Sequence, residues 1–360
     1  MPEIVPIRTG TVVAPRVPGA RSELSPAARA AVAAGIPDST RRAYADDFGR
    51  YAAWCGERGL VALPAEPETV TEYATHLVTT PRKRTGRPYA PASVERVIAS
   101  IRTAHRAAGV PPPETKGARK VLTGYRAALS QSDDDTDRQR AQANRVSAAV
   151  PAVLRKFVAS LDRDDLKGKR DAALMLLGHA IAGRASELVS LNVGSIETDP
   201  DGRGIAVKVY RRKIKRWTTT KVMYGSHPAT CPVRATLALI DALAEAGRTD
   251  GPLFVRMDQH GNVAPPMTRY GQPIGDPAGR MTTTAAANIV EAAAEAAGVD
   301  GRWRSHSMRR GFVTAARAAG SDLVDIGRHG GWADGSKALL AYIEEDDGWS
   351  DRNPLVGIGL

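Results

Sequence analysis

The chain has little cysteine and no long apolar run. Its 360 residues include only two cysteines, Cys55 and Cys231, which are far apart in the sequence. Such a pair suggests neither a disulfide framework nor a thiolate metal site. No stretch approaches the roughly 20 apolar residues of a membrane span, and the N-terminus lacks the apolar segment of a secretory signal. We therefore expect a cytoplasmic protein without a membrane partner.

Sequence patterns of nucleotide-dependent and two-metal catalysis are also missing. No GxxxxGK[ST] phosphate-binding loop occurs in the chain. The acidic runs DDD (133–135) and EEDD (344–347) are contiguous, whereas the carboxylates of a two-metal site are distributed along the chain. We interpret both runs as solvated charge and expect neither a metal nor a cofactor.

Positive charge is abundant. The formal net charge is +11 and the isoelectric point is about 9.8. A balance this basic favours a polyanionic partner, usually a nucleic acid. Residues 1–25 are rich in Pro, Gly, Arg and Val without helical periodicity, which predicts a flexible basic arm.

Residues 26–130 predict a small all-helical domain. Tyr44, Phe48, Tyr51 and Cys55 recur at helical spacing after a possible cap at Asp38 or Ser39. Further helices are expected from Pro67, from a cap at Ser93, and over 115–129.

Basic residues concentrate in one loop of this domain and on the helix that follows it. A solvated face would explain them, but their concentration favours a surface that contacts the phosphates of a nucleic acid. The candidate DNA-binding residues are Arg82, Lys83, Arg84, Arg87, Arg96 and Arg102.

A polar linker is expected over 131–147, followed by a second domain over 148–348 and a tail over 349–360. Strand patterns at 205–210 and 218–224 flank the basic turn RRKIKRW. The predicted helices cover 150–161, 171–179, 185–190, 282–297, 306–319, 322–328 and 336–342. The expected fold class is mainly α with a small antiparallel β-sheet.

Several residues of the second domain could form a phosphate-directed site, although each is weak evidence alone. His306 and Arg309 are three apart, so they share one face of a helix. Arg184 follows Gly183 and could simply pair with Glu187. Tyr342 could be a core residue.

Order and spacing together carry more weight. The run AGRASELVSLNVGSI, the hairpin lysine, HSMRRGF, GGW and Tyr342 follow one another in a pattern that resembles the tyrosine recombinase (phage integrase) family. The resemblance covers nearly the whole chain, including the helical DNA-binding (core-binding) domain before the catalytic one. GGW before the tyrosine resembles the tryptophan variant, of which Cre recombinase is an example.

The resemblance implies site-specific DNA cleavage and rejoining through a covalent 3′-phosphotyrosine, for integration or excision of a mobile element or for resolution of replicon dimers. It implies catalytic roles for six residues and a supporting role for Glu187. The six are Arg184, Lys213, His306, Arg309, Trp332 and Tyr342, the nucleophile.

Some alternatives stay open in the sequence. Lys215 competes with Lys213, His329 is a rival to Trp332, and Tyr342 lies ten residues after Trp332. The expected partner is double-stranded DNA that carries specific recombination sites. We expect the protein to be a monomer in solution and to form a homotetramer on synapsed DNA. A type IB topoisomerase-like enzyme and a catalytically inactive DNA-binding protein are the competing functions. The target sequence is not encoded in any motif.

Overall fold

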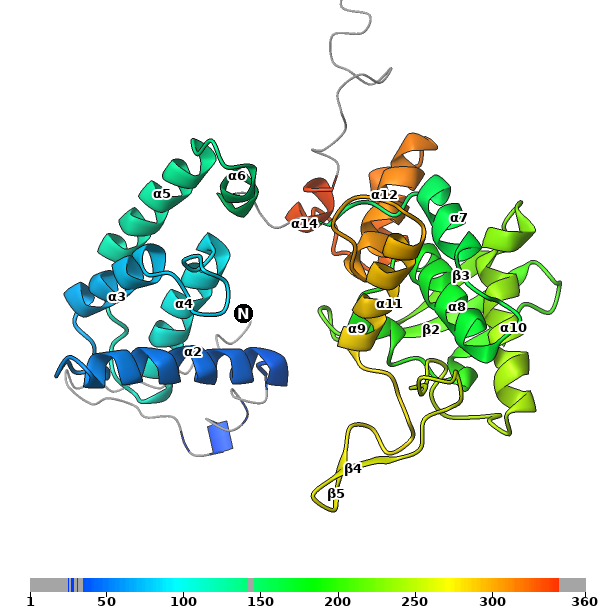
Figure 1. The fold of residues 1–360 in the computed structure, drawn as a ribbon, viewed down its shortest axis with the longest axis horizontal. Helices are drawn as coiled ribbons and strands as arrows, with labels where there is room; N and C mark the ends of the chain where they lie inside the picture. Colours follow the sequence, from blue (N-terminus) through cyan, green and yellow to red (C-terminus); the bar gives the residue numbers. More distant parts are fainter. Residues whose placement is uncertain (1–24, 26, 29–30, 32–34, 142–145, 343–360) are drawn as a thin grey trace, which may run out of the picture. The chain divides into compact units, whose positions relative to one another are not determined.

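The computed structural model describes residues 25, 27, 28, 31, 35–141 and 146–342. The chain divides into two compact units, 1–144 and 145–360 (Figure 1). The expected arm, apart from Ser25, and the expected tail over 349–360 lie outside the described residues. Within the described ranges, no helix is long and apolar enough to cross a membrane.

The first unit is built from helices, as its apolar periodicity predicts. Tyr51, Val70, Val94 and Ile101 are buried in its core. Helices α3 and α4 each have a proline in the first turn, where the missing N–H would have no partner in the helix. The helices whose bounds the structure gives in this unit are α2 (Asp38–Gly56), α3 (Pro67–Thr79), α4 (Pro91–Ala107), α5 (Lys116–Ser130) and α6 (Asp135–Ala141).

Two helix starts differ from the sequence expectation. Pro37 precedes α2 and Ala90 precedes α4, and neither helix has a side-chain cap. The expected caps at Asp38 or Ser39 and at Ser93 therefore lie inside the helices. Proline sets the backbone angle φ near the helical value, which explains why α4 begins at Pro91.

The segment 131–147, which we expected to be a polar linker, contains the short helix α6. Arg87 forms ion pairs with Asp134 and Asp137, and Arg140 donates to the Tyr125 hydroxyl at 2.9 Å. These polar contacts attach α6 to the first unit without an apolar face. A helix that is held by polar contacts and buries no apolar face cannot be predicted from hydrophobic periodicity.

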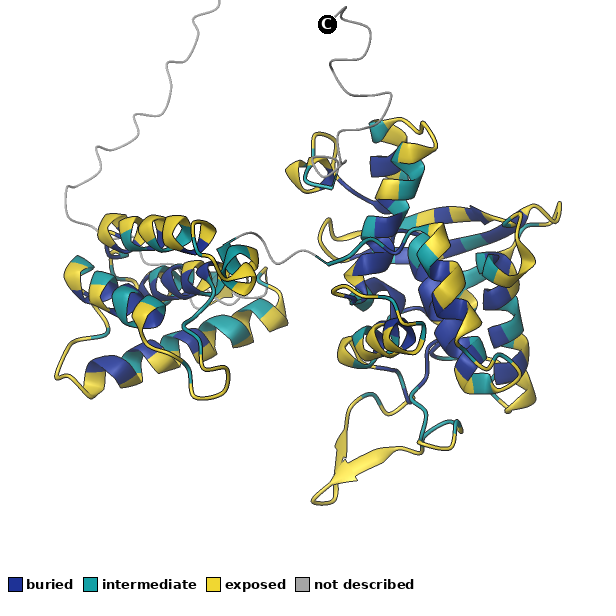
Figure 2. Ribbon diagram, turned by 45° about the horizontal axis from the view of Figure 1, so that its top comes forward, coloured by how far each residue is buried: buried dark blue, intermediate teal, exposed yellow. Residues whose placement is uncertain are grey.

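The second unit surrounds the buried helix α8, which packs against α10 and α12. Figure 2 shows its core in dark blue, while the β4–β5 hairpin is exposed. Three strands form an antiparallel sheet in the order β1-β2-β3. The α-helices of this unit are α7 (Pro151–Ala159), α8 (Leu166–Ala180), α9 (Ala185–Leu188), α10 (Pro232–Glu245), α11 (Thr283–Ala296), α12 (His306–Ala318), α13 (Leu323–Gly330) and α14 (Lys337–Leu340). The strands are β1 (Ile196–Thr198), β2 (Gly204–Arg211), β3 (Arg216–Met223), β4 (Met267–Arg269) and β5 (Gln272–Ile274).

The predicted fold class, mainly α with a small antiparallel sheet, is confirmed. Helix α10 and the β4–β5 hairpin were not predicted. The last predicted helix, 336–342, is shorter in the structure, because α14 ends at Leu340. Tyr342 therefore lies just beyond this helix, in the turn that follows it.

Candidate active site

Arg184 stands at the start of α9, directly after the chain leaves α8. Ala182 has a φ of 47°, a left-handed conformation that turns the backbone between the two helices. The Arg184 N–H donates to Oε2 of Glu187 at 3.0 Å, and Nη1 donates to Oε1 at 2.6 Å. The predicted Arg184–Glu187 pair is thus present, and it fixes the arginine at the helix start.

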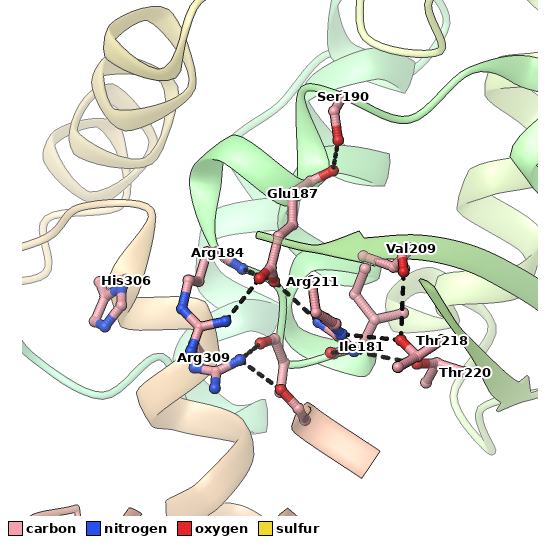
Figure 3. Close-up of polar contacts among 12 residues, drawn as sticks. Ile181, Arg184, Glu187, Ser190, Val209, Arg211, Thr218, Thr220, His306 and Arg309 are labelled. Atoms are coloured by element: carbon pink, nitrogen blue, oxygen red, sulfur yellow. Dashed lines mark hydrogen bonds and ion pairs between the residues drawn. The ribbon is translucent and has the colours of Figure 1, made fainter. Parts of the chain in front are cut away.

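Glu187 is fully buried and shared between two arginines (Figure 3). Its second partner is Arg211, whose Nη1 lies 3.0 Å from Oε2. Burial alone would raise the pKa of Glu187, but the backbone hydrogen bond from Arg184 and the charges of Arg184 and Arg211 lower that pKa below its usual value. The carboxylate therefore remains ionised and can hold both guanidinium groups.

Arg309 extends from α12 into the core and is also fully buried. Its Nη1 donates to the carbonyl oxygens of Ala182 and Gly330, the latter at 2.8 Å. Its Nε and Nη2 have no hydrogen-bond partner among the described residues. Burial lowers the pKa of Arg309, yet a guanidinium stays protonated at neutral pH. Unpartnered buried donors of this kind suit an anionic ligand.

Trp332 packs against this guanidinium. The Arg309 Cζ atom lies 3.3 Å from the centre of the Trp332 ring, a cation–π contact. A Cβ atom on Gly330 would lie 1.8 Å from the ring, and Gly331 has a φ of 66°. The two glycines of the GGW triplet therefore allow the indole to fold back onto Arg309.

Tyr342 reaches His306. The Tyr342 hydroxyl and His306 Nε2 are 2.8 Å apart, and the Tyr342 and Trp332 rings meet edge to face with centroids 6.0 Å apart. Burial lowers the pKa of His306, and so do the charges of Arg309 and Arg184. The imidazole is therefore mainly neutral at pH 7 and can accept a proton.

The pKa of Tyr342 is raised by burial, while the charges of Arg309 and Arg184 oppose this effect. The two arginines favour the phenolate, but the effect of burial on this pKa is larger. The hydroxyl is thus protonated at neutral pH and needs a proton acceptor before it can attack. His306 is within hydrogen-bond distance for that task.

The structure therefore brings together Arg184, Glu187, His306, Arg309, Trp332 and Tyr342, but not Lys213. Lys213 is exposed in the turn between β2 and β3, and no hydrogen bond joins it to the other site residues in the described part of the chain. Lys215 occupies the same turn with a φ of 50°. The choice between the two lysines stays a prediction.

His329, the rival to Trp332, has no hydrogen bond or ring contact with Tyr342 among the described residues and is held by other partners. Its Nε2 donates to the carbonyl oxygen of Ala180 at 2.6 Å, and its ring stacks on Phe312 with centroids 4.8 Å apart. These contacts give His329 a structural role in the packing of α13, and they leave Trp332 as the residue beside the tyrosine.

Arg211 was missed, although the sequence carried a signal for it. Every second residue of β2 points into the core of the second unit. Ile205, Val207 and Val209 are such residues, and Arg211 is the next one in the same alternation. An arginine at an inward position is rarely buried without a partner. The strand pattern of β2 therefore implies a buried carboxylate near its end, and Glu187 is that carboxylate.

The candidate DNA-binding residues of the first unit differ in their surroundings. Arg96 forms an ion pair with the buried Asp47, and Arg87 pairs with Asp134 and Asp137. Lys83 and Arg84 are exposed, whereas Arg102 is half-buried. The Arg82 guanidinium lies 4.8 Å from the centre of the Tyr89 ring.

Comparison with known proteins gives the family. The sequence profile of the Phage integrase family matches residues 151–348. The integrase/recombinase xerD homolog of Selenomonas ruminantium is 28% identical over 319 residues, covering 88% of this chain and 84% of the relative. The tyrosine recombinase slr0733 of Synechocystis sp. is 26% identical over 208 residues, covering 56% of this chain and 58% of the relative.

Solved structures share the fold. The lambda integrase(75–356) dimer bound to a COC′ core site matches with a TM-score of 0.52 at 13% identity, covering 89% of this chain and 94% of that one. A lambda integrase tetramer bound to a Holliday junction matches with a TM-score of 0.50 at 12% identity, covering 87% and 74%. The chain belongs to the phage integrase family, and it is a site-specific DNA recombinase of the tyrosine type.

Proposed function

We propose that Tyr342 attacks a DNA phosphodiester to form a 3′-phosphotyrosine and to release a 5′ hydroxyl. The observation that carries this proposal is the 2.8 Å contact between the Tyr342 hydroxyl and His306 beside two guanidinium groups. The phosphodiester bond is exchanged rather than hydrolysed. Attack by another 5′ hydroxyl then rejoins the strand without ATP.

His306 acts as the proton acceptor in this scheme. Its lowered pKa keeps the imidazole neutral at pH 7, so Nε2 can receive the phenolic proton as the Tyr342 oxygen bonds to phosphorus. The same group returns the proton when the strand is rejoined. Proton transfer of this kind contributes about 10²–10⁴-fold to a rate.

Arg184 and Arg309 bind the non-bridging oxygens of the phosphate. Arg309 supports this role best, because its Nε and Nη2 are buried and have no partner among the residues described. Phosphoryl transfer depends mainly on position and charge stabilisation. Removing one preorganised donor from such a site costs about 10²–10³-fold in rate.

Trp332 takes, in this proposal, the role that the resemblance to the tryptophan variant implies. Its contact with Arg309 holds the guanidinium in place, and its indole N–H is a donor for a phosphate oxygen. Lys213, or Lys215 in its place, lies in the β2–β3 turn and protonates the leaving 5′ oxygen.

The assembly on DNA is also a proposal. Lambda integrase is solved as a dimer on a core site and as a tetramer on a Holliday junction. We expect this chain to be a monomer in solution and to act in the cytoplasm as four protomers on two DNA sites. Integration, excision and resolution all fit the same chemistry.

Covalent capture tests the proposed reaction with a pool of DNA sequences in place of one chosen target. The protein is incubated with DNA duplexes whose central sequence is random and which carry a nick, so that cleavage releases a short strand and traps the adduct. Denaturing electrophoresis isolates the adduct, and sequencing then gives the site. We expect an adduct with the wild type, none with Tyr342→Phe, and a normal yield with the matched control Tyr224→Phe, whose ring lies beside Arg234.

Two results would contradict the proposal. One is an adduct that persists in Tyr342→Phe. The other is a wild-type protein that binds duplex DNA selectively but forms no adduct with any sequence in the pool, which favours a catalytically inactive DNA-binding protein.

A further inference from the structure

Arg211 is a fully buried arginine next to the two arginines that the proposed function uses. Its side chain is fully buried at the end of β2. A buried guanidinium is costly unless its donors are satisfied. Those of Arg211 are satisfied by acceptors that come from three separate parts of the second unit.

The acceptors tie the site together. Arg211 Nη1 binds Oε2 of Glu187 at 3.0 Å, and Nη2 donates to the Ile181 and His329 carbonyl oxygens at 3.1 and 3.2 Å. The hydroxyls of Thr218 and Thr220, on the adjacent strand β3, accept from Nε and Nη2. Arg211 thus joins the turn that carries Arg184, the strand pair that carries Lys213, and the helix end that precedes Trp332.

The backbone at Gly331 leaves space for the Arg211 side chain. Gly331 has a φ of 66°, and a Cβ atom there would lie 2.8 Å from Nε of Arg211. A larger residue would therefore displace the arginine or the turn. Gly331 therefore has two effects. It leaves space for the Arg211 side chain, and it allows the Trp332 indole to pack on Arg309.

The division of Glu187 between two arginines has a consequence for Arg184. With Arg211 present, Oε2 accepts from Arg211 and from the Arg184 backbone, and the Arg184 guanidinium binds Oε1 through Nη1. Without Arg211, a two-point pair between the Arg184 guanidinium and both oxygens is the favoured arrangement. That pair would use a second guanidinium donor that is otherwise available to the phosphate.

We propose that Arg211 is a positioning residue for DNA cleavage, which holds Glu187 and two backbone carbonyls so that the Arg184 guanidinium stays directed at the scissile phosphate. This inference rests on the proposed function, since it concerns the same phosphate. Arg211 touches neither the DNA nor the nucleophile in this role. It acts through Arg184 and through the backbone before Trp332.

The test uses the full chain and the nicked duplex obtained by covalent capture. Arg211→Met removes both the charge and the planar guanidinium with its several N–H donors. Arg211→Lys keeps the charge but offers a single ammonium group in place of the guanidinium. The matched control is Arg203→Met, because Arg203 lies in the turn before β2 and is paired with Asp199 at the surface. DNA affinity, thermal unfolding and the single-turnover cleavage rate are measured for each protein.

A second substrate separates positioning from folding. Replacement of one non-bridging oxygen of the scissile phosphate by a methyl group removes its negative charge, so cleavage depends less on a guanidinium. We expect Arg211→Met to cleave the ordinary phosphate about 10–100-fold more slowly, which is less than the loss of a direct donor. On the methylphosphonate, the variant should come within about fivefold of the wild type, and its DNA affinity should change by less than about threefold.

The results distinguish a positioning role of Arg211 from a purely structural one. A cleavage rate of Arg211→Met or Arg211→Lys equal to that of Arg203→Met would overturn the proposal. So would a loss of equal size on both substrates, because a purely structural defect does not depend on the charge of the phosphate. If Arg211→Met does not fold, Arg211→Lys decides by the same comparison. A wild-type protein without any adduct would instead contradict the proposed function.

Discussion

At the scale of single residues, the site is a cluster of buried positive charge with one carboxylate. Arg211 and Arg309 are fully buried, and Glu187 lies between Arg184 and Arg211. Burial of such charges costs free energy of folding, so the cluster is poorly explained as a device for stability. It is well explained as a preorganised site for a phosphate, since its donors need not reorganise when negative charge develops.

The two turn lysines give a prediction at this scale. If Lys213 protonates the leaving 5′ oxygen, Lys213→Ala should slow cleavage by about 10²–10⁴-fold. A duplex with sulfur in place of that oxygen should be cleaved at nearly the wild-type rate, because a thiolate leaves without a proton. The matched control is Lys215→Ala in the same turn. If Lys215→Ala shows the loss and the rescue instead, the roles of the two lysines are reversed.

At the scale of secondary structure, helix α12, which carries His306 and Arg309, depends on a close backbone contact. Residues 146–149 run along its first turns, where the Ala149 N–H donates to the Ser307 carbonyl at 3.0 Å and Arg310 donates to the Val146 carbonyl at 2.7 Å. Gly311 makes this approach possible, since a Cβ atom there would lie 2.1 Å from the Ala149 oxygen. The position of His306 and Arg309 therefore depends on a glycine that is not itself one of the predicted site residues.

A pair of identical substitutions tests this dependence. Gly311→Ala should reduce the free energy of unfolding by about 1–3 kcal/mol because it overpacks the contact, and it should also slow cleavage. Gly124→Ala, in the interior of α5, places its Cβ in open space and should be neutral or stabilising by up to about 1 kcal/mol. Urea unfolding followed by circular dichroism measures both. Equal unfolding midpoints for the two variants would contradict the packing argument.

The elements also show which parts of the structure the sequence could predict. Apolar periodicity located α12 and the β2–β3 strands, because their buried faces repeat at 3.6 and 2 residues. It could not locate α6, which is held by ion pairs, or β4–β5, which are exposed on both faces. The contact between Arg309 and Trp332 depends on tertiary packing, so residue order indicated the members of the site but not their geometry.

At the scale of the whole molecule, the net charge of +11 is spread over two units. The structure divides the basic residues of the first unit into those that pair with carboxylates and those that do not pair within the described ranges. Arg87 and Arg96 belong to the first group, and Lys83 and Arg84 belong to the second. A charge already neutralised by a protein carboxylate releases fewer counterions from DNA than an unpaired one.

Salt dependence measures this division. The logarithm of the DNA association constant falls with the logarithm of the salt concentration by about 0.9 per phosphate contacted. Replacement of Arg82, Lys83 and Arg84 together by alanine should therefore reduce the slope by up to about 2.7. Arg87→Ala should change it by less than about 0.5, because its guanidinium already binds Asp134 and Asp137. Fluorescence anisotropy with a labelled duplex at several salt concentrations gives both slopes. An unchanged slope in the triple variant, with normal cleavage, would place the phosphate-binding surface elsewhere in the chain.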